Sequence, residues 1–94
     1  MKLFNYRLNF LAAKWYREAA EQGDVDTQIS LAIMYLNGTG IPVNKVKGYM
    51  WFSLAKTQGH EKGAEGLEIV RKVMTLAGIS KAQALASEWW EKHN

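Results

Sequence analysis

The stretch WYREAAEQGD at residues 15–24 returns in modified form as WFSLAKTQGH at residues 51–60, thirty-six positions further along the chain. Identical residues continue beyond these two stretches at the same offset. The aligned pairs are Trp15 and Trp51, Ala19 and Ala55, Gln22 and Gln58, Gly23 and Gly59, Leu31 and Leu67, and Ile33 and Ile69. A repeat of this length is typical of solenoids built from helical hairpins. The repetition therefore predicts stacked pairs of helices.

Apolar spacing within each unit predicts where the helices lie. Apolar side chains, Trp15 among them, recur at steps of three and four residues ahead of Gly23, which is the pattern of one buried helical face. Gly23 and Gly59 stand where a helix ends in a left-handed residue, a conformation that glycine adopts without a Cβ clash. We therefore predict that Trp15 and Trp51 occupy equivalent positions in the core.

The segment YLNGTGIP at residues 35–42 is predicted to be a turn between two helices. A phosphate-binding loop would need a strand before it and a lysine with a serine or threonine after its last glycine, and the chain has neither here. Asn44 is placed to cap the helix that follows. The helix before the turn is predicted to bury the stripe Leu31, Ala32, Met34 and Tyr35.

A final helix is predicted near the C-terminus. Thr75 can cap its start, and Ser80 with Gln83 forms a competing start because Gly78 weakens the first turn. Its predicted packing face consists of Leu76, Ile79, Ala82, Ala86 and Trp89.

The segment GDVDTQISLAIMYLNGTGIPVNKVKGYMWFSLAKTQGH at residues 23–60 resembles a complete Sel-one-like repeat, a relative of the tetratricopeptide repeat. The pattern positions are occupied by Gln28, Leu31, Ala32, Met34, Tyr35, Gly38, Gly40, Pro42, Trp51, Ala55 and Gly59. The resemblance implies an all-α, right-handed superhelical solenoid of antiparallel helix hairpins, with about five helices. It divides the single domain 1–94 into a divergent segment 1–11, a half repeat 12–23, a full repeat 24–59, a terminal half repeat 60–74 and a capping helix 75–94.

Composition narrows the class of protein. The chain has 94 residues, a net charge of +3 and 48% hydrophobic residues, which excludes a disordered chain and suits one small helical domain. It has no cysteine, so disulfides and thiolate chemistry are excluded. Polar residues interrupt the apolar N-terminus, which favours a cytoplasmic protein without a signal peptide and leaves a periplasmic or secreted one open. We also expect no insertion into a membrane.

Candidates for catalysis and metal binding are few. His60 and His93 lie far apart in the sequence, and neither has a second strong ligand at a metal-binding spacing. His60 stands where the resembled family commonly has a histidine after the glycine, which favours a role in the turn. Asp24 and Asp26 open a helix, where acidic side chains offset the helix dipole. We therefore expect no catalytic residue, no metal and no cofactor.

The sequence favours a non-catalytic module for protein–protein interaction, because stacked hairpins expose a continuous groove. The resemblance implies adaptor or scaffold roles in bacterial complexes and a groove lined by the helix after each Gly23-type residue. The alternative, which resemblance to some family members would allow, is an enzyme or binder acting on cell-wall or β-lactam ligands. We expect no nucleic-acid binding. If a basic surface did bind nucleic acid or anionic lipid, its affinity would fall strongly as the salt concentration rises. The residues of such a surface would be Lys45, Lys47, Lys56, Arg71 and Lys72. The residues predicted to bind the protein or peptide partner are Asp26, Ser30, Ile33, Asn37, Lys62, Glu65, Ile69 and Lys72.

The two ends of the predicted solenoid differ. Glu68 and Arg71 stand where Ala32 and Tyr35 pack in the preceding unit, so another repeat is not expected to stack there. The N-terminal helix has no partner helix before it. We expect self-association to a homodimer through this edge, and the alternative is a monomer whose first eleven residues form their own covering helix. The apolar residues of the edge are Phe4, Tyr6, Phe10 and Leu11.

Overall fold

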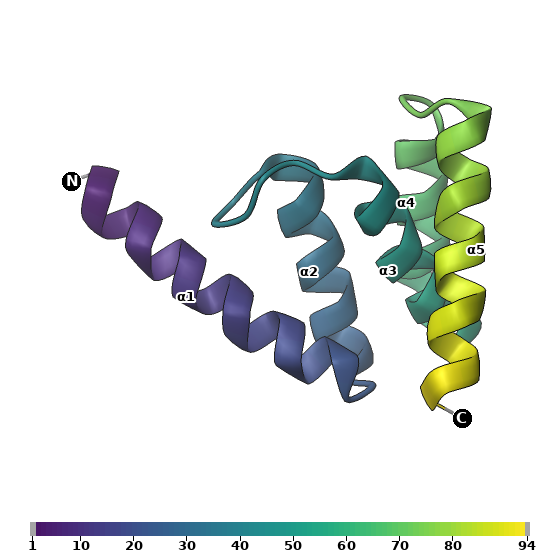
Figure 1. Cartoon of the computed structure of the whole chain (residues 1–94), viewed down its shortest axis with the longest axis horizontal. Coiled ribbons are helices and arrows are strands. Elements are labelled where there is room, and N and C mark those ends of the chain that lie inside the picture. The colour runs from purple at the N-terminus through teal and green to yellow at the C-terminus, as the bar shows by residue number, and fades with distance from the viewer. Residues whose placement is uncertain (1, 94) are drawn as a thin grey trace.

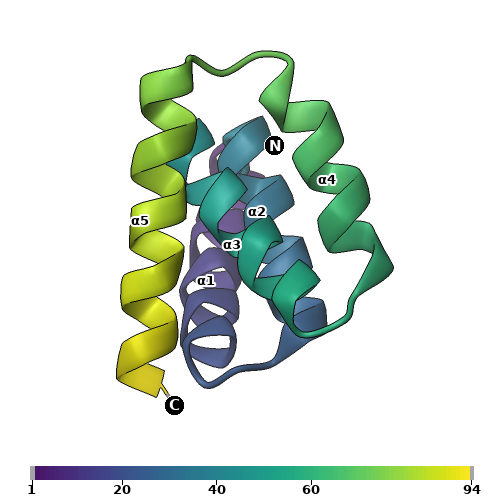
Figure 2. The ribbon, with the colours of Figure 1, turned by 90° about the vertical axis from the view of Figure 1, so that its right-hand side faces the viewer.

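A computed structural model describes the backbone of residues 2–93 and the side chains of residues 9–93. Over these residues the chain is all-α. Successive helices run in opposite directions, with the connecting loops at alternating ends of the molecule (Figures 1 and 2). The helices are α1 (Lys2–Glu21), α2 (Val25–Asn37), α3 (Lys45–Thr57), α4 (Glu61–Arg71) and α5 (Leu76–His93).

The predicted turn between α2 and α3 is confirmed, and local chemistry explains it. Gly38 ends α2 in the left-handed conformation, with φ of 73°, and its N–H donates to the Met34 carbonyl at 2.8 Å. Gly40, the second glycine of the turn, has φ of 78°. Asn44 then begins α3, because its side-chain oxygen accepts a hydrogen bond from the Lys47 N–H at 3.0 Å.

Replacing Asn44 with alanine is expected to lower the free energy of unfolding by about 1 kcal/mol, because the Lys47 N–H then loses its partner at the start of α3. Urea unfolding monitored by circular dichroism measures the loss. Asn44→Ser is the control, since serine caps helices about as well as asparagine does. Equal losses in the two variants would show that the hydrogen bond contributes nothing.

The core lies around α3, which packs against α2, α4 and α5. Figure 2 shows α3 between α4 and α5. The predicted stripe of α2 is buried, as is Trp51, which is 2% exposed. The edge of one ring meets the face of the other where Trp51 contacts Trp89 of α5, with ring centroids 5.9 Å apart and planes at 71°. The helix α5 therefore covers α3.

The prediction that Trp15 is a core residue is wrong. Trp15 is 69% exposed. The face of α1 that packs on α2 is made of alanines, with Ala13 and Ala20 fully buried, and it lies nearly opposite Trp15 around the helix. Trp51 owes its burial to α5, and no other helix of the described residues covers Trp15 in the same way. Equivalence in the repeat therefore does not give equivalence in burial.

The helix α1 is continuous from Lys2 to Glu21, so the alternative in which the first eleven residues fold back as their own helix is wrong. Figure 1 shows α1 slanting away from the other helices toward the N-terminus. The turn before α3 touches it on the way, because a Cβ added at Gly40 would overlap the Asn9 carbonyl. A glycine at position 40 is therefore required for close approach as well as for its positive φ.

The helix α5 begins at Leu76, after Thr75, whose hydroxyl accepts a hydrogen bond from the Gly78 N–H at 3.0 Å. Thr75 is thus the start, and Ser80 is not. Ala82 and Ala86 are buried, but Leu76 is 86% exposed, and its prediction as a packing residue is wrong. It is the first residue of α5, and its side chain faces solvent.

One buried polar side chain joins three helices. Gln28, at the first turn of α2, is fully buried. Its amide nitrogen donates to the Ala20 carbonyl of α1 at 3.1 Å, and its amide oxygen accepts from Gln58, at the end of α3, at 2.8 Å. Gln28 therefore holds the ends of α1 and α3 to the beginning of α2.

Candidate partner-binding groove

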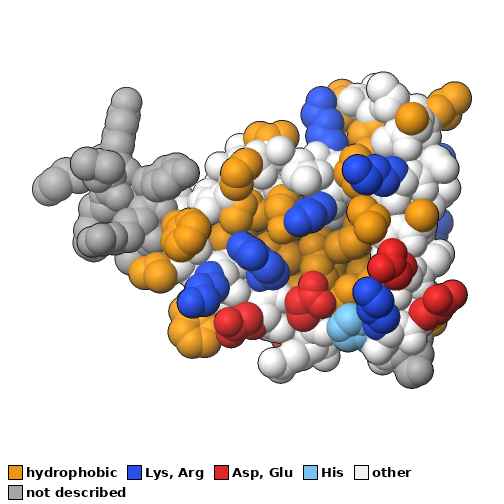
Figure 3. Space-filling view, viewed as in Figure 1, with side chains coloured by type: hydrophobic (Ala, Val, Ile, Leu, Met, Phe, Trp, Pro, Cys, Tyr) orange, Lys and Arg blue, Asp and Glu red, His pale blue; other side chains and the backbone are white. Residues whose placement is uncertain are grey.

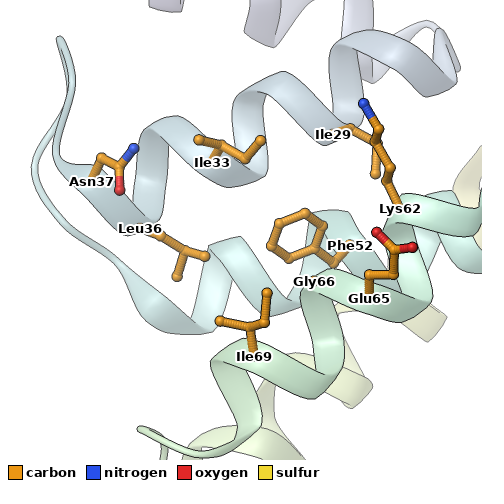
Figure 4. Close-up of a pocket in the computed structure, with 9 residues that line it drawn as sticks. All are labelled: Ile29, Ile33, Leu36, Asn37, Phe52, Lys62, Glu65, Gly66 and Ile69. Carbon is orange, nitrogen blue, oxygen red and sulfur yellow. The ribbon is translucent and has the colours of Figure 1, made fainter.

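A groove runs between α2 and α4, with α3 as its floor. Its cavity volume is about 290 Å³. In Figure 4 the side chains of α2 and α4 converge on the ring of Phe52, which rises from α3 between them. The lining residues are Ile29, Ile33, Leu36 and Asn37 of α2, Phe52 of α3, and Lys62, Glu65, Gly66 and Ile69 of α4.

Two glycines of α4 determine how close this helix lies to the floor. A Cβ added at Gly66 would come within 2.5 Å of the Phe52 ring, and one added at Gly63 would come within 2.5 Å of the Lys56 backbone nitrogen. Real Cβ atoms do not approach other atoms so closely, because the packing in a protein interior is dense. These glycines therefore let α4 lie directly against α3 and let the ring of Phe52 form the floor.

The walls of the groove carry exposed apolar side chains. Ile33 on α2 is 45% exposed and Ile69 on α4 is 68% exposed, although Phe52 beneath them is buried. Lys62, Glu65 and Asn37 add charge and hydrogen-bonding groups to the lining. The groove therefore has an apolar centre with polar groups beside it, the composition usual for binding sites.

A hydrogen bond links α2 to α4 near their N-terminal ends. The Nδ1 atom of His60 accepts from the Lys62 N–H at 3.1 Å and so caps α4. Because Nδ1 is an acceptor, the proton lies on Nε2, which donates to the Asp26 carboxylate at 3.0 Å. The predicted role of His60 in the turn is thus confirmed. Asp26 ties the first turn of α2 to the start of α4.

The structure brings most of the predicted partner-binding residues together. The residues Ile33, Asn37, Lys62, Glu65 and Ile69 line the groove. The other predicted residues, Asp26, Ser30 and Lys72, do not line it, and Asp26 pairs with His60 instead.

Sequence reasoning missed the floor of the groove and part of the α2 wall. Phe52 belongs to the apolar stripe of α3, and a stripe does not reveal which of its members face a gap between two other helices. Gly66 was missed as well, although glycine inside a helix signals a close approach. Ile29 and Leu36 complete the missed set.

Asp24, the other acidic candidate at the start of α2, has a structural role. The Asp24 carboxylate caps α2 by accepting from the Thr27 N–H at 3.1 Å, and this hydrogen bond lowers the pKa of Asp24. A lowered pKa makes a carboxylate a weaker base, which suits a helix cap. The described residues contain no cluster of three side chains that could hold a metal ion. Within the same part of the chain, no helix has the length and apolarity needed to span a bilayer.

Antiparallel helix hairpins around a groove define the class of helical-repeat solenoid proteins. The Sel1 repeat model matches residues 9–24 and 25–60, so the chain belongs to the Sel1 repeat family. The structure is also similar to the crystal structure of c5321, described as a protective antigen present in uropathogenic Escherichia coli strains and displaying an SLR fold.

The similarity to c5321 has a TM-score of 0.85 at 32% sequence identity and covers 90% of the present chain. The chain spans 18% of the length of c5321. Comparison with curated proteins gave no match. The recognition of the family and the prediction of an all-α solenoid are thus confirmed.

Proposed function

We propose that the chain is a non-catalytic protein-interaction module that binds a peptide segment of a protein partner in the groove between α2 and α4. The observation that carries this proposal is the apolar floor of Phe52 beneath the exposed side chains of Ile33 and Ile69. Solenoid repeats typically use such concave surfaces for partners. Membership of the Sel1 repeat family supports the same function.

The dimensions of the groove favour a short peptide contact. Its volume of about 290 Å³ lies just below the range of ligand pockets, which is roughly 300–1,000 Å³. That is enough for a few bulky apolar side chains of a peptide, inserted between Ile33 and Ile69 above Phe52. Lys62 and Glu65, which are one turn apart on α4, are placed to pair with charges of both signs on the same peptide.

The proposal is tested by selecting peptides from a random library displayed on phage, with the intact chain as bait. We expect the selected peptides to share a large aliphatic or aromatic residue. In fluorescence polarisation, synthetic copies should bind Ile33→Asp at least about tenfold more weakly than the unaltered chain. The reason is that the apolar side chain of the peptide would desolvate the new carboxylate.

Leu76→Asp is the matched control, since Leu76 is an exposed aliphatic residue outside the groove. Both substitutions replace exposed side chains, so both variants should fold. Peptides that bind Ile33→Asp and the unaltered chain equally would place the binding surface elsewhere. Selected peptides without a common apolar residue would also contradict the proposal.

A further inference from the structure

The outer side of α1 carries exposed apolar side chains. Leu11 is 46% exposed and Trp15 is 69% exposed, one turn apart on the side away from the buried residues Ala13 and Ala20. Phe10 is 53% exposed nearby. Figure 3 shows apolar, basic and acidic side chains alternating along this edge, next to the grey atoms of residues that are not described. Exposed apolar side chains grouped on one side of a helix form a candidate interaction surface.

The charges of α1 are arranged against the dipole of the helix. There is no acidic residue in the first turn and no basic residue in the last. Acidic groups stabilise the beginning of a helix and basic groups its end, each by roughly 0.3–1 kcal/mol. In the sequence of α1, the basic residues come first and the acidic residues follow: Lys2, Arg7, Lys14 and Arg17, then Glu18 and Glu21. This order does not favour an isolated helix.

We propose that α1 pairs with α1 of a second copy of this chain, in the antiparallel direction. Antiparallel pairing sets Arg7 of each helix level with Glu18 of the other, on the side of α1 that carries Leu11 and Trp15, and this attraction offsets part of the unfavourable order within each helix. It also buries Leu11 of one copy against Trp15 of the other around a two-fold axis. A parallel pair would instead place like charges side by side.

The acidic end of α1 is held in place for this contact. Trp89 of α5 donates its indole N–H to the Glu21 carboxylate at 3.0 Å, and His93 lies 3.5 Å from the same oxygen. These contacts anchor the last turn of α1 to the body of the molecule, while Leu11 and Trp15 stay open to solvent. Among the residues predicted for self-association, Phe10 and Leu11 are exposed. Phe4 and Tyr6 have side chains outside the described residues.

Sedimentation velocity of the intact chain tests the pairing. We expect dimers at roughly 100 µM and monomers for Trp15→Lys at the same concentration, because a lysine would place a charge in the seam. Val43→Lys is the control: Val43 is 56% exposed but lies in the turn before α3, and this variant should remain dimeric. A monomeric intact chain at this concentration overturns the proposal. Dimers that survive Trp15→Lys overturn it as well.

Disulfide cross-linking tests the direction of the pair, since the chain has no cysteine of its own. In an antiparallel pair with Leu11 against Trp15, position 7 of one copy lies near position 18 of the other. We expect Arg7→Cys mixed with Glu18→Cys to form a disulfide-linked dimer under mild oxidation, at least about tenfold faster than either variant alone. Faster cross-linking of either single variant would indicate a parallel pair, and equal rates would indicate no fixed direction; either result would contradict the proposal.

Glu18→Lys separates pairing from the stability of the helix itself. A lysine near the end of α1 suits the helix dipole, so the variant should be no less stable in the monomeric Trp15→Lys background. In the otherwise unaltered chain, the substitution removes the attraction between Glu18 of one copy and Arg7 of the other, which occurs twice in the dimer. We therefore expect the dimer dissociation constant to rise roughly threefold to tenfold. An unchanged or lower dissociation constant would overturn the antiparallel arrangement.

Discussion

Replacing Trp51 with alanine is expected to lower the free energy of unfolding by about 3–5 kcal/mol, which is the usual cost of removing a large buried aromatic side chain. Trp51 is 2% exposed and contacts Trp89 of α5. Its loss would leave a cavity between α3 and α5, so α5 would lose its main aromatic contact. The effect is a large part of the stability of a domain of this size.

The matched control is Trp15→Ala, at the equivalent position of the repeat. Trp15 is 69% exposed, and the expected change is within about 0.5 kcal/mol. Guanidinium unfolding at a concentration where the chain is monomeric measures both variants, because dimerisation through α1 would add a second contribution at Trp15. Equal losses at the two positions would show that α1 packs as α3 does, contrary to the structure.

Replacing Gln28 with alanine is expected to lower the free energy of unfolding by about 2–4 kcal/mol. The change removes the hydrogen bonds to Ala20 and Gln58, each contributing roughly 1 kcal/mol, and it leaves a cavity at a fully buried position. Thermal and denaturant unfolding by circular dichroism measure the loss. Because Gln28 joins α1, α2 and α3, the variant should also reduce the protection of the Ala20 region from hydrogen exchange.

Gln22→Ala is the control for Gln28→Ala. Gln22 is exposed and follows the last residue of α1, so the expected change is within about 0.5 kcal/mol. A double-mutant cycle with Gln58→Ala isolates the bond between the two amides. A coupling energy near zero would show that the Gln28 amide stabilises the fold only through Ala20 and through packing.

Local sequence signals were sufficient for the turn between α2 and α3 and for the starts of α3 and α5. The glycine at position 38 and the caps at Asn44 and Thr75 depend on neighbours within a few residues, and all three are confirmed. Burial was harder to predict, because it depends on helices that lie far away in the sequence. Trp15 and Trp51 share a repeat position, but α5 covers only Trp51. Periodicity marks an apolar residue without showing what covers it.

The sequence predicted exposed residues of the groove walls but not its floor. The exposed side chains of α2 and α4, such as Ile33 and Ile69, follow from helical spacing. The floor required the distance between α3 and α4. That distance depends on Gly63 and Gly66, which admit the Lys56 backbone and the Phe52 ring. The pairing of Asp26 with His60 joins residues far apart in sequence, and helical spacing could not reveal it.

The two walls of the groove are unequally supported by the rest of the fold. The helix α2 packs against both α1 and α3, whereas α4 has its extensive contact with α3 alone. A wall supported along one side yields more readily than one supported along two, and elements with few neighbours open at the lowest free energy. The groove therefore has a fixed edge and a compliant edge. For the proposed peptide, the fixed edge would set the register and the compliant edge would adjust to the size of the peptide side chains. Under the proposed function, such a site would tolerate varied peptide sequences around one apolar anchor.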